Sequence, residues 1–320
     1  MAKYLLRRLM QTIIVLLIVS VAAFLLTSLM PGDPVIAYYG SNDITPEAYD
    51  RIFLELNLDK PIWTRFGIWF WNALHMDFGN SYVYKTPVWG VILQRLPVTL
   101  YLAFISLIIS VPLGVLFGVL TAVKRGTFVD TLLTLLANIL ACLPRFLVGV
   151  LLLYWLCIKN GLLPSYGFDW SWNVGLHQHI RYMIIPISCL ALSGIAGFTR
   201  QTRSSVLEVI RQDYVRTARA KGLREQIVIS KHVLRNSLLP IITILGTRFA
   251  QMIGGAVFVE NVFTIPGMGT MIMTCINSQD IPMIQALVLI TALICCIVNI
   301  LTDLLYVIVD PRIGLVNAGN

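Results

Sequence analysis

Charged residues are scarce in this sequence. Only 12% of its 320 residues are Asp, Glu, Lys or Arg, whereas 57% are hydrophobic. A soluble domain carries about 25% charged residues, so this chain has too little polar surface to cover a water-soluble globule. Its apolar residues form runs close to the roughly 20 residues that cross a bilayer as a helix. The composition therefore predicts an all-α, polytopic membrane protein.

The sequence also lacks the signatures of catalysis and metal binding. It contains no GxSxG, HExxH or Walker A motif. Five of the six cysteines fall inside apolar runs, Cys275 lies in a predicted loop, and no CxxC pair occurs, which is typical of small core residues. His177 and His179 have no third metal ligand nearby, and we interpret them as part of a solvated loop. We expect no enzyme, no metal site and no cofactor in this chain; a nucleotide-driven process would need ATP and Mg²⁺ on another polypeptide.

Six apolar runs are candidates for transmembrane helices. The first is too long for the apolar region of a signal peptide and lacks a small-residue cleavage site, so we expect it to remain as a helix. The motif Pro31-Gly32-Asp33-Pro34 ends it, because proline removes a donor and disfavours helix just before it. The predicted spans are Leu9–Met30, Pro97–Val123, Thr131–Ile158, Met183–Phe198, Leu238–Val259 and Pro282–Val309, of which the fourth is the shortest.

Basic residues lie mainly on one side of these spans. Three precede the first span, two lie between the second and third, and nine lie in the loop 199–237, whereas none lies between Glu260 and Pro282. Cytoplasmic loops are enriched in lysine and arginine, so both termini and the loop 199–237 are predicted to be cytoplasmic. The same placement accounts for the net charge of +8 without nucleic-acid binding.

The predicted topology divides the chain into four parts. Residues 1–30 hold the cytoplasmic start and first helix, 31–96 an extracytoplasmic segment, 97–309 the membrane core, and 310–320 a cytoplasmic tail. The segment 31–96 is polar and rich in aromatic residues, among them Trp63, Trp69 and Tyr82. We interpret it as a cap with interfacial aromatics; a ligand site of its own is the alternative.

The loop 199–237 is long enough for two short helices. Val206, Ile210, Tyr214 and Ala218 follow one another at four-residue spacing and predict an apolar stripe on a basic helix. Gly222 is suited to end that helix, because glycine readily adopts the left-handed conformation. The pattern favours a docking surface for a partner over a helix that lies on anionic lipid.

The same loop resembles a known family. It reads Asp213-Tyr214-Val215-Arg216-Thr217-Ala218-Arg219-Ala220-Lys221-Gly222-Leu223 and continues through His232-Val233-Leu234-Arg235-Asn236 to Leu239-Pro240. This is similar to the EAA loop of ABC importer permeases, in the version of the dipeptide, oligopeptide and nickel permeases. Arg216-Thr217-Ala218 stands where the broader family has Glu-Ala-Ala, so the glutamate is absent. The resemblance implies that the ATPase contacts Tyr214, Arg216, Thr217, Ala218, Ala220, Lys221, Gly222, Leu223, His232 and Arg235.

Further stretches resemble the first permease of such pairs along nearly the whole chain. They include Asp77-Phe78-Gly79-Asn80-Ser81, Leu96-Pro97-Val98-Thr99-Leu100, Pro266-Gly267-Met268-Gly269 and Asp310-Pro311-Arg312. The resemblance implies the type I importer fold in a bacterial inner membrane. It also implies four partners: a second homologous permease, two ABC ATPase subunits and an extracytoplasmic solute-binding protein.

The resemblance leaves the cargo open among short peptides, nickel, metal–chelator complexes and glutathione-like compounds. An ion-coupled secondary transporter is the alternative from another class. It would require acidic residues inside the spans, which offer only Asp303 near one end.

Two arginines interrupt the predicted spans. Arg145 follows Pro144 in the third span, and Arg248 lies in the middle of the fifth. A charge at this depth costs at least about 2.5–3.5 kcal/mol on insertion scales unless it faces protein or water. Either these arginines are structural, paired with a backbone carbonyl or Asp303, or they line a solute pathway.

Overall fold

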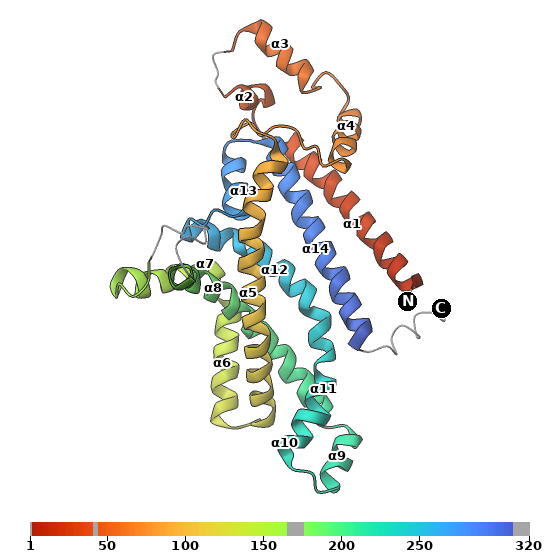
Figure 1. Cartoon of the computed structure of the whole chain (residues 1–320), viewed down its shortest axis with the longest axis vertical. Coiled ribbons are helices and arrows are strands. Elements are labelled where there is room, and N and C mark those ends of the chain that lie inside the picture. Colours follow the sequence, from red (N-terminus) through yellow and green to blue (C-terminus); the bar gives the residue numbers. More distant parts are fainter. Residues whose placement is uncertain (1, 41–43, 165–175, 310–320) are drawn as a thin grey trace.

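The computed structural model describes residues 2–40, 44–164 and 176–309, in which long helices form a bundle (Figure 1). The predicted tail 310–320, with Asp310-Pro311-Arg312, lies outside the described residues. The long helices are α1 (Ala2–Ser28), α5 (Val88–Val123), α8 (Leu176–Val209), α12 (Leu239–Phe263) and α14 (Ile281–Val309). This architecture agrees with the all-α prediction.

Short helices lie at both ends of the bundle (Figure 1). At one end are α2 (Pro34–Tyr39), α3 (Pro46–Glu55) and α4 (Ile62–Leu74), together with α13 (Met268–Asn277), which joins α12 to α14. At the other end are α9 (Asp213–Ala220), α10 (Glu225–Ile227) and α11 (Leu234–Ser237). The segment 31–96 and the loop 199–237 thus occupy opposite ends of the molecule.

The third predicted span is broken. Among the described residues, five helices are long and apolar enough to cross a membrane, and up to six crossings result if one bent pair counts as a span. That pair is α6 (Phe128–Cys142) and α7 (Arg145–Leu152) with its π-helical continuation Leu153–Lys159, and it bends by 104°. One continuous helix over Thr131–Ile158 is therefore wrong. The break lies at Leu143, which is extended (φ −73°, ψ 131°) because a following proline disfavours helix.

Small residues join α5 to α8, the most extensive helix pair in the bundle. A Cβ on Gly114 or Gly118 would collide with α8, as in the small-residue interfaces that let membrane helices approach closely. Ser106 and Ser110 donate across the interface to the carbonyls of Ile187 and Ala191, at 3.3 and 3.1 Å. Since 106 meets 187 and 110 meets 191, the two helices run parallel.

The fourth predicted span is longer than hydropathy indicated. Helix α8 begins at Leu176 and continues through polar residues to Val209, whereas the prediction covered Met183–Phe198 only. It therefore includes His177 and His179, so their assignment to a solvated loop is wrong. His179 is only 2% exposed, and its ring lies edge-on to Tyr101 with centroids 5.4 Å apart.

Two further pairs of long helices are antiparallel. Helices α1 and α14 are joined by a Gln285–Thr27 hydrogen bond of 2.7 Å near one end and by an Arg8–Asp303 ion pair of 3.1 Å near the other. Helices α8 and α12 meet where Gly194 contacts Met252 and Gly197 contacts Arg248. Both pairings fix opposite directions for the helices that they join.

A buried acid attaches the segment 31–96 to the core. Asp280 is fully buried at the start of α14. One of its oxygens accepts hydrogen bonds from the Ser81 hydroxyl at 2.5 Å and from the Val83 amide at 3.1 Å. The neighbouring Cys275, predicted to lie in a loop, is instead fully buried on α13.

A second buried acid holds α12, α13 and α5 together. Glu260 is fully buried near the end of α12. Its carboxylate accepts hydrogen bonds from the Thr99 hydroxyl at 2.6 Å and from the amides of Gly269 and Thr270 at 2.6 and 3.3 Å. Among the acids, only Asp303 was expected to lie within a span. Glu260 was missed because it directly follows the predicted end of the fifth span.

Candidate coupling surface and pathway face

The loop 199–237 folds into two short helical segments, as predicted, but its apolar stripe does not lie on one helix. Val206 lies on α8, Ile210 in the following turn, and Tyr214 and Ala218 on α9. The single stripe is therefore wrong. Gln212 is extended (φ −71°, ψ 147°), so the helical phase is interrupted between Ile210 and Tyr214.

The inner side of α9 is a small apolar core. Val215 and Ala218 are buried against Val206 of α8 and Ala122 at the end of α5, and Val228 and Val233 complete the cluster. The Asn236 amide also donates to the Tyr214 hydroxyl at 2.8 Å, which ties α9 to α11. Among the residues predicted to contact an ATPase, Ala218 therefore packs inward and supports the fold of the loop.

The outer side of α9 and its turn is exposed. Most of the residues predicted to contact an ATPase are exposed, whereas His232 is partly buried. The exposed residues are Tyr214, Arg216, Thr217, Ala220, Lys221, Gly222, Leu223 and Arg235. The predicted left-handed glycine is confirmed, since Gly222 has φ +76°. Arg219 spans the turn with two hydrogen bonds to Glu225, at 2.7 and 3.1 Å, which hold the pKa of that carboxyl below its usual value.

Arg145 lies at the break between α6 and α7 and reaches across to α12. Its guanidinium donates to the backbone carbonyl of Gln251. A Cβ on Gly255 would lie 2.9 Å from the Arg145 Cζ, so the side chain lies flat against α12 where that helix has no side chain. The pairing with a backbone carbonyl agrees with one of the two predicted alternatives, whereas Asp303 pairs with Arg8 instead.

Arg248 belongs to α12 and lies on the side of that helix that Arg145 contacts. Its guanidinium donates to the side chain of Gln251 at 3.1 Å, and it packs on α8, where a Cβ on Gly197 would lie 2.8 Å from its Cζ. Arg200, one turn further along α8, is exposed and close enough to Arg248 for their charges to repel. In the part of the chain that the structure describes, no carboxylate lies within 4 Å of these three arginines. Arg200 was missed because it lies just beyond the predicted fourth span.

The exposed face of α12 is unusually polar for a membrane helix. At intervals of three or four residues it presents Thr243, Thr247, Gln251, Gly254, Phe258 and Asn261. By contrast, the exposed face of α1 carries Leu9, Ile13 and Ile18. Lipid tails cannot satisfy polar side chains, so this α12 face meets water, solute or another protein chain. Its chemistry, bordered by Arg145 and Arg248, suits a passage for solutes with acceptor groups.

Within the described ranges, no group of three or more His, Cys, Asp or Glu residues could hold a metal ion. The positively charged border of α12 would also repel a free metal cation. The positive charge of this border favours solutes with hydrogen-bond acceptors or carboxylates.

Comparison with known sequences gives matches over nearly the whole chain. The family described as "Binding-protein-dependent transport system inner membrane component" matches residues 114–315, and its N-terminal counterpart matches residues 1–103. AppB, an oligopeptide transport system permease protein of Bacillus subtilis, is 37% identical over 315 residues, covering 98% of this chain and 99% of AppB. A Brucella abortus protein named as a peptide transport system permease is 39% identical over 313 residues, with the same coverage of both chains.

Solved structures show a similar fold. The MetNI methionine ABC transporter in an inward-facing conformation aligns with a TM-score of 0.55 at 16% identity, over 68% of this chain and 96% of that chain. An amino acid ABC transporter with histidines aligns with a TM-score of 0.52 at 16% identity, over 70% and 94%. At this identity the likeness concerns the arrangement of helices alone.

Proposed function

Because the chain belongs to the family of binding-protein-dependent transport system inner membrane components, we propose that it imports short peptides as the permease subunit of an ATP-driven transporter. Members of this family are integral inner-membrane proteins that act with ATPase and solute-binding partners. The permease itself has no ATPase site. Relatives that are 37–39% identical over 98% of the chain and are named as peptide permeases support peptides as the cargo.

The assembly that fits this function contains a second homologous permease, two ATPase subunits that bind ATP and Mg²⁺, and an extracytoplasmic solute-binding protein. The exposed polar face of α12 faces the second permease and the solute path between them. The exposed side of α9 with Gly222 and Leu223 receives the ATPase, which places both termini in the cytoplasm and the segment 31–96 outside. None of these partners requires a cofactor bound to this chain.

Rigid connections couple the loop to the pathway face. Helix α9 is buried against the ends of α5 and α8, and α11 continues into α12 with only Leu238 between them. A displacement of α9 by the ATPase therefore moves α12, which carries Arg248 and Gln251. This connection supports alternating access, in which ATP binding closes the ATPases and opens the permeases outward, and hydrolysis resets both.

The observation that carries the choice of cargo is the pair Arg145 and Arg248 beside the polar face of α12, without a carboxylate partner in the described part of the chain. Every peptide with a free C-terminus supplies a carboxylate. One charge-assisted hydrogen bond contributes about 1.5–3 kcal/mol, which is enough to orient a passing solute without trapping it.

The test is transport by the complete complex in proteoliposomes. Arg145→Gln is expected to slow uptake of a peptide with a free C-terminus by about tenfold or more, while a C-terminally amidated peptide changes little. Arg125→Gln, which alters an exposed arginine after α5, serves as the control. Arg145→Lys retains the charge and should recover part of the uptake. Equal uptake of both peptides by all variants would contradict the proposal.

A further inference from the structure

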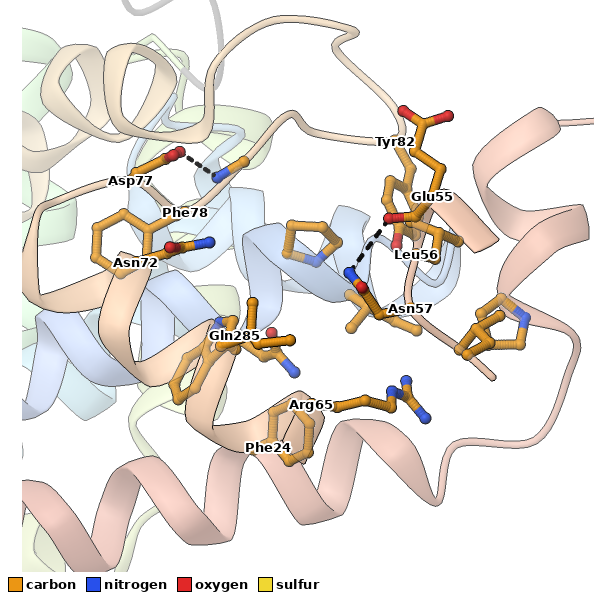
Figure 2. A pocket seen from close by; sticks show the side chains of 17 residues that line it. Phe24, Glu55, Leu56, Asn57, Arg65, Asn72, Asp77, Phe78, Tyr82 and Gln285 are labelled. Carbon is orange, nitrogen blue, oxygen red and sulfur yellow. Dashed lines mark hydrogen bonds between the residues drawn. The ribbon is translucent and has the colours of Figure 1, made fainter. Parts of the chain in front are cut away.

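A cavity of about 240 Å³ lies beside α4, at the end of the bundle opposite the coupling loop (Figure 2). Its walls come from α4, from the end of α3, from the loop around Asp77, and from the facing ends of α1 and α14. Figure 2 shows Tyr82 entering the cavity from one side and Arg65 lying on the other, with Phe24 and Gln285 beneath. The cavity is distinct from the α12 face and its arginines.

Three side chains with hydrogen-bond donors line the cavity, and two of them, Arg65 and Trp69, have no acceptor among the described residues. Arg65, Trp69 and Asn72 follow one another at positions i, i+4 and i+7, so they lie on one face of α4 and line the cavity together. The Trp69 Nε1 is buried without a hydrogen-bond partner. Arg65 forms no ion pair with an acid in the described ranges, although Glu55 and Asp77 line the same cavity.

Tyr82 adds a further donor from the opposite wall. It is 8% exposed, and among the described residues no hydrogen bond of its hydroxyl is formed. Burial raises the pKa of this hydroxyl, so it keeps its proton and can donate. The fully buried donor of this cavity is the Trp69 Nε1, and a buried donor without a partner requires an explanation such as a missing ligand.

The acids in the cavity have other partners. Asp77 accepts from the Gly79 amide at 3.0 Å, and Glu55 accepts from the Tyr38 hydroxyl at 3.5 Å. Apolar walls are supplied by Phe24, Ile68 and Phe78. The combination fits the terminal residue of a peptide: a carboxylate for the donors, an amide N–H for the acids, and a side chain for the apolar walls.

We propose that this cavity is a carboxylate-binding site that receives the C-terminal end of the cargo on the outer face of the permease. The volume is below the roughly 300–1,000 Å³ of pockets that enclose a whole drug-sized ligand, so it holds one end of a peptide. Arg65 and Tyr82 bind the carboxylate, and Trp69 and Asn72 complete its hydrogen bonds. The choice of a peptide as the source of the carboxylate depends on the proposed function; the chemistry of the cavity does not.

The experiment measures binding of dialanine and of dialaninamide, which lacks the carboxylate, to the complete transporter in nanodiscs without its binding protein. Isothermal titration calorimetry is carried out in the Arg145→Gln background, so that the α12 face contributes little. Arg65→Gln is expected to weaken dialanine binding by about tenfold or more, and Tyr82→Phe by several-fold. Arg51→Gln changes an exposed arginine of α3 that does not line the cavity and should leave binding unchanged.

The possible outcomes distinguish a site for a peptide carboxylate from a site for a carboxylate of the solute-binding protein. Unchanged dialanine binding in both Arg65→Gln and Tyr82→Phe, or equal binding of dialaninamide, would overturn the proposal. So would a result in which dialanine does not bind but Arg65→Gln weakens docking of the solute-binding protein, because the carboxylate would then belong to that protein. If the wild-type complex binds dialanine through Arg65 yet transports no peptide, the site stands and the proposed function fails.

Discussion

At the residue scale, Glu260 is the least expected feature of the bundle. A buried carboxylate without a cation is costly unless hydrogen bonds compensate for the lost water. Three donors do so here, and two of them are the backbone amides of Gly269 and Thr270 at the start of α13. Negative charge is favoured at a helix N-terminus, where backbone amides lack helical partners. Glu260 therefore fixes how α13 leaves α12.

Replacement of Glu260 should destabilise the protein in a graded way. Glu260→Gln keeps the size but presents an NH₂ group to donors, and Glu260→Ala leaves all three donors unsatisfied. Each unsatisfied buried group costs about 1–3 kcal/mol, so the alanine variant should lose more stability than the glutamine variant. Thermal unfolding of the purified complex measures the effect, and Glu47→Gln, at an exposed position of α3, is the control. Equal unfolding temperatures for all three variants would show that Glu260 does not hold α13.

The arginines beside α12 depend on glycines that sequence reasoning could not have selected. Arg145 and Arg248 were recognisable in the sequence as charges inside apolar runs. Gly255 and Gly197 became significant only when tertiary packing placed the two guanidinium groups against them.

A methyl group at Gly255 would displace Arg145 from the carbonyl of Gln251. We expect Gly255→Ala to slow peptide uptake almost as much as Arg145→Gln, without removing any charge. Gly90→Ala offers a matched control, because Gly90 of α5 is exposed, lies outside the α12 face, and has nothing within 4 Å of its added Cβ. Uptake assays on the two alanine variants decide the question; equal rates would mean that the position of Arg145 is unimportant.

At the element scale, the turn after α9 allows the effect of backbone strain at Gly222 to be tested separately from the effect of a lost side-chain contact with the ATPase. Gly222 has φ +76°, and nothing lies within 4 Å of an added Cβ. A β-branched residue there is disfavoured by its backbone conformation alone. The turn lies on the exposed surface proposed to meet the ATPase, so a local change of its shape alters the contact.

Gly222→Val should uncouple ATP hydrolysis from transport, whereas Gly222→Asn should preserve coupling, because asparagine tolerates the left-handed conformation. Gly126→Val is the matched control, since Gly126 has φ +80° and open space but lies in the turn between α5 and α6. The ratio of ATP hydrolysed to peptide imported measures coupling. Normal coupling in Gly222→Val would contradict the role given to this turn.

The orientation of α9 also decides which residues an ATPase can reach. Ala220 and Leu223 are exposed, whereas Ala218 is only 5% exposed. In a cysteine-free background, cysteines at positions 220 and 223 should crosslink to an ATPase subunit, and a cysteine at 218 should not. Crosslinks from position 218, or from the N-terminal residues in place of the loop, would show that a different surface is used.

Hydropathy predicted the long helices well because each must bury one continuous apolar length in the bilayer. It failed at irregular positions. The break at Pro144 lies inside an apolar run, so composition does not reveal it, although the proline itself is the cause. The extension of α8 beyond Phe198 continues into polar residues such as Arg200, and the interruption at Gln212 follows no glycine or proline. Such boundaries depend on tertiary contacts that a periodic pattern does not contain.

At the scale of the whole molecule, the direction of each helix decides how many times the chain crosses the membrane. Helices α5 and α8 run parallel, as the pairs 106 with 187 and 110 with 191 require. The chain must therefore return across the bundle between them, and α6 with α7 is the segment that does so. We therefore expect the bent pair to count as one crossing, which gives six crossings in total and both termini on the same side.

Reporter fusions test this count at the break. A periplasmic reporter should be active after Asn80 and after Gly161, and inactive after Arg125 and Lys221. Gly161 is the informative site, because it follows the π-helical end of the bent pair. If α6 and α7 formed a re-entrant loop, the reporter after Gly161 would be inactive like that after Arg125. Helix α8 would then start on the cytoplasmic side and α5 on the opposite side, and their parallel contacts through Ser106 and Ser110 could not form. A fusion after His179 would be uninformative, since that residue is buried within α8.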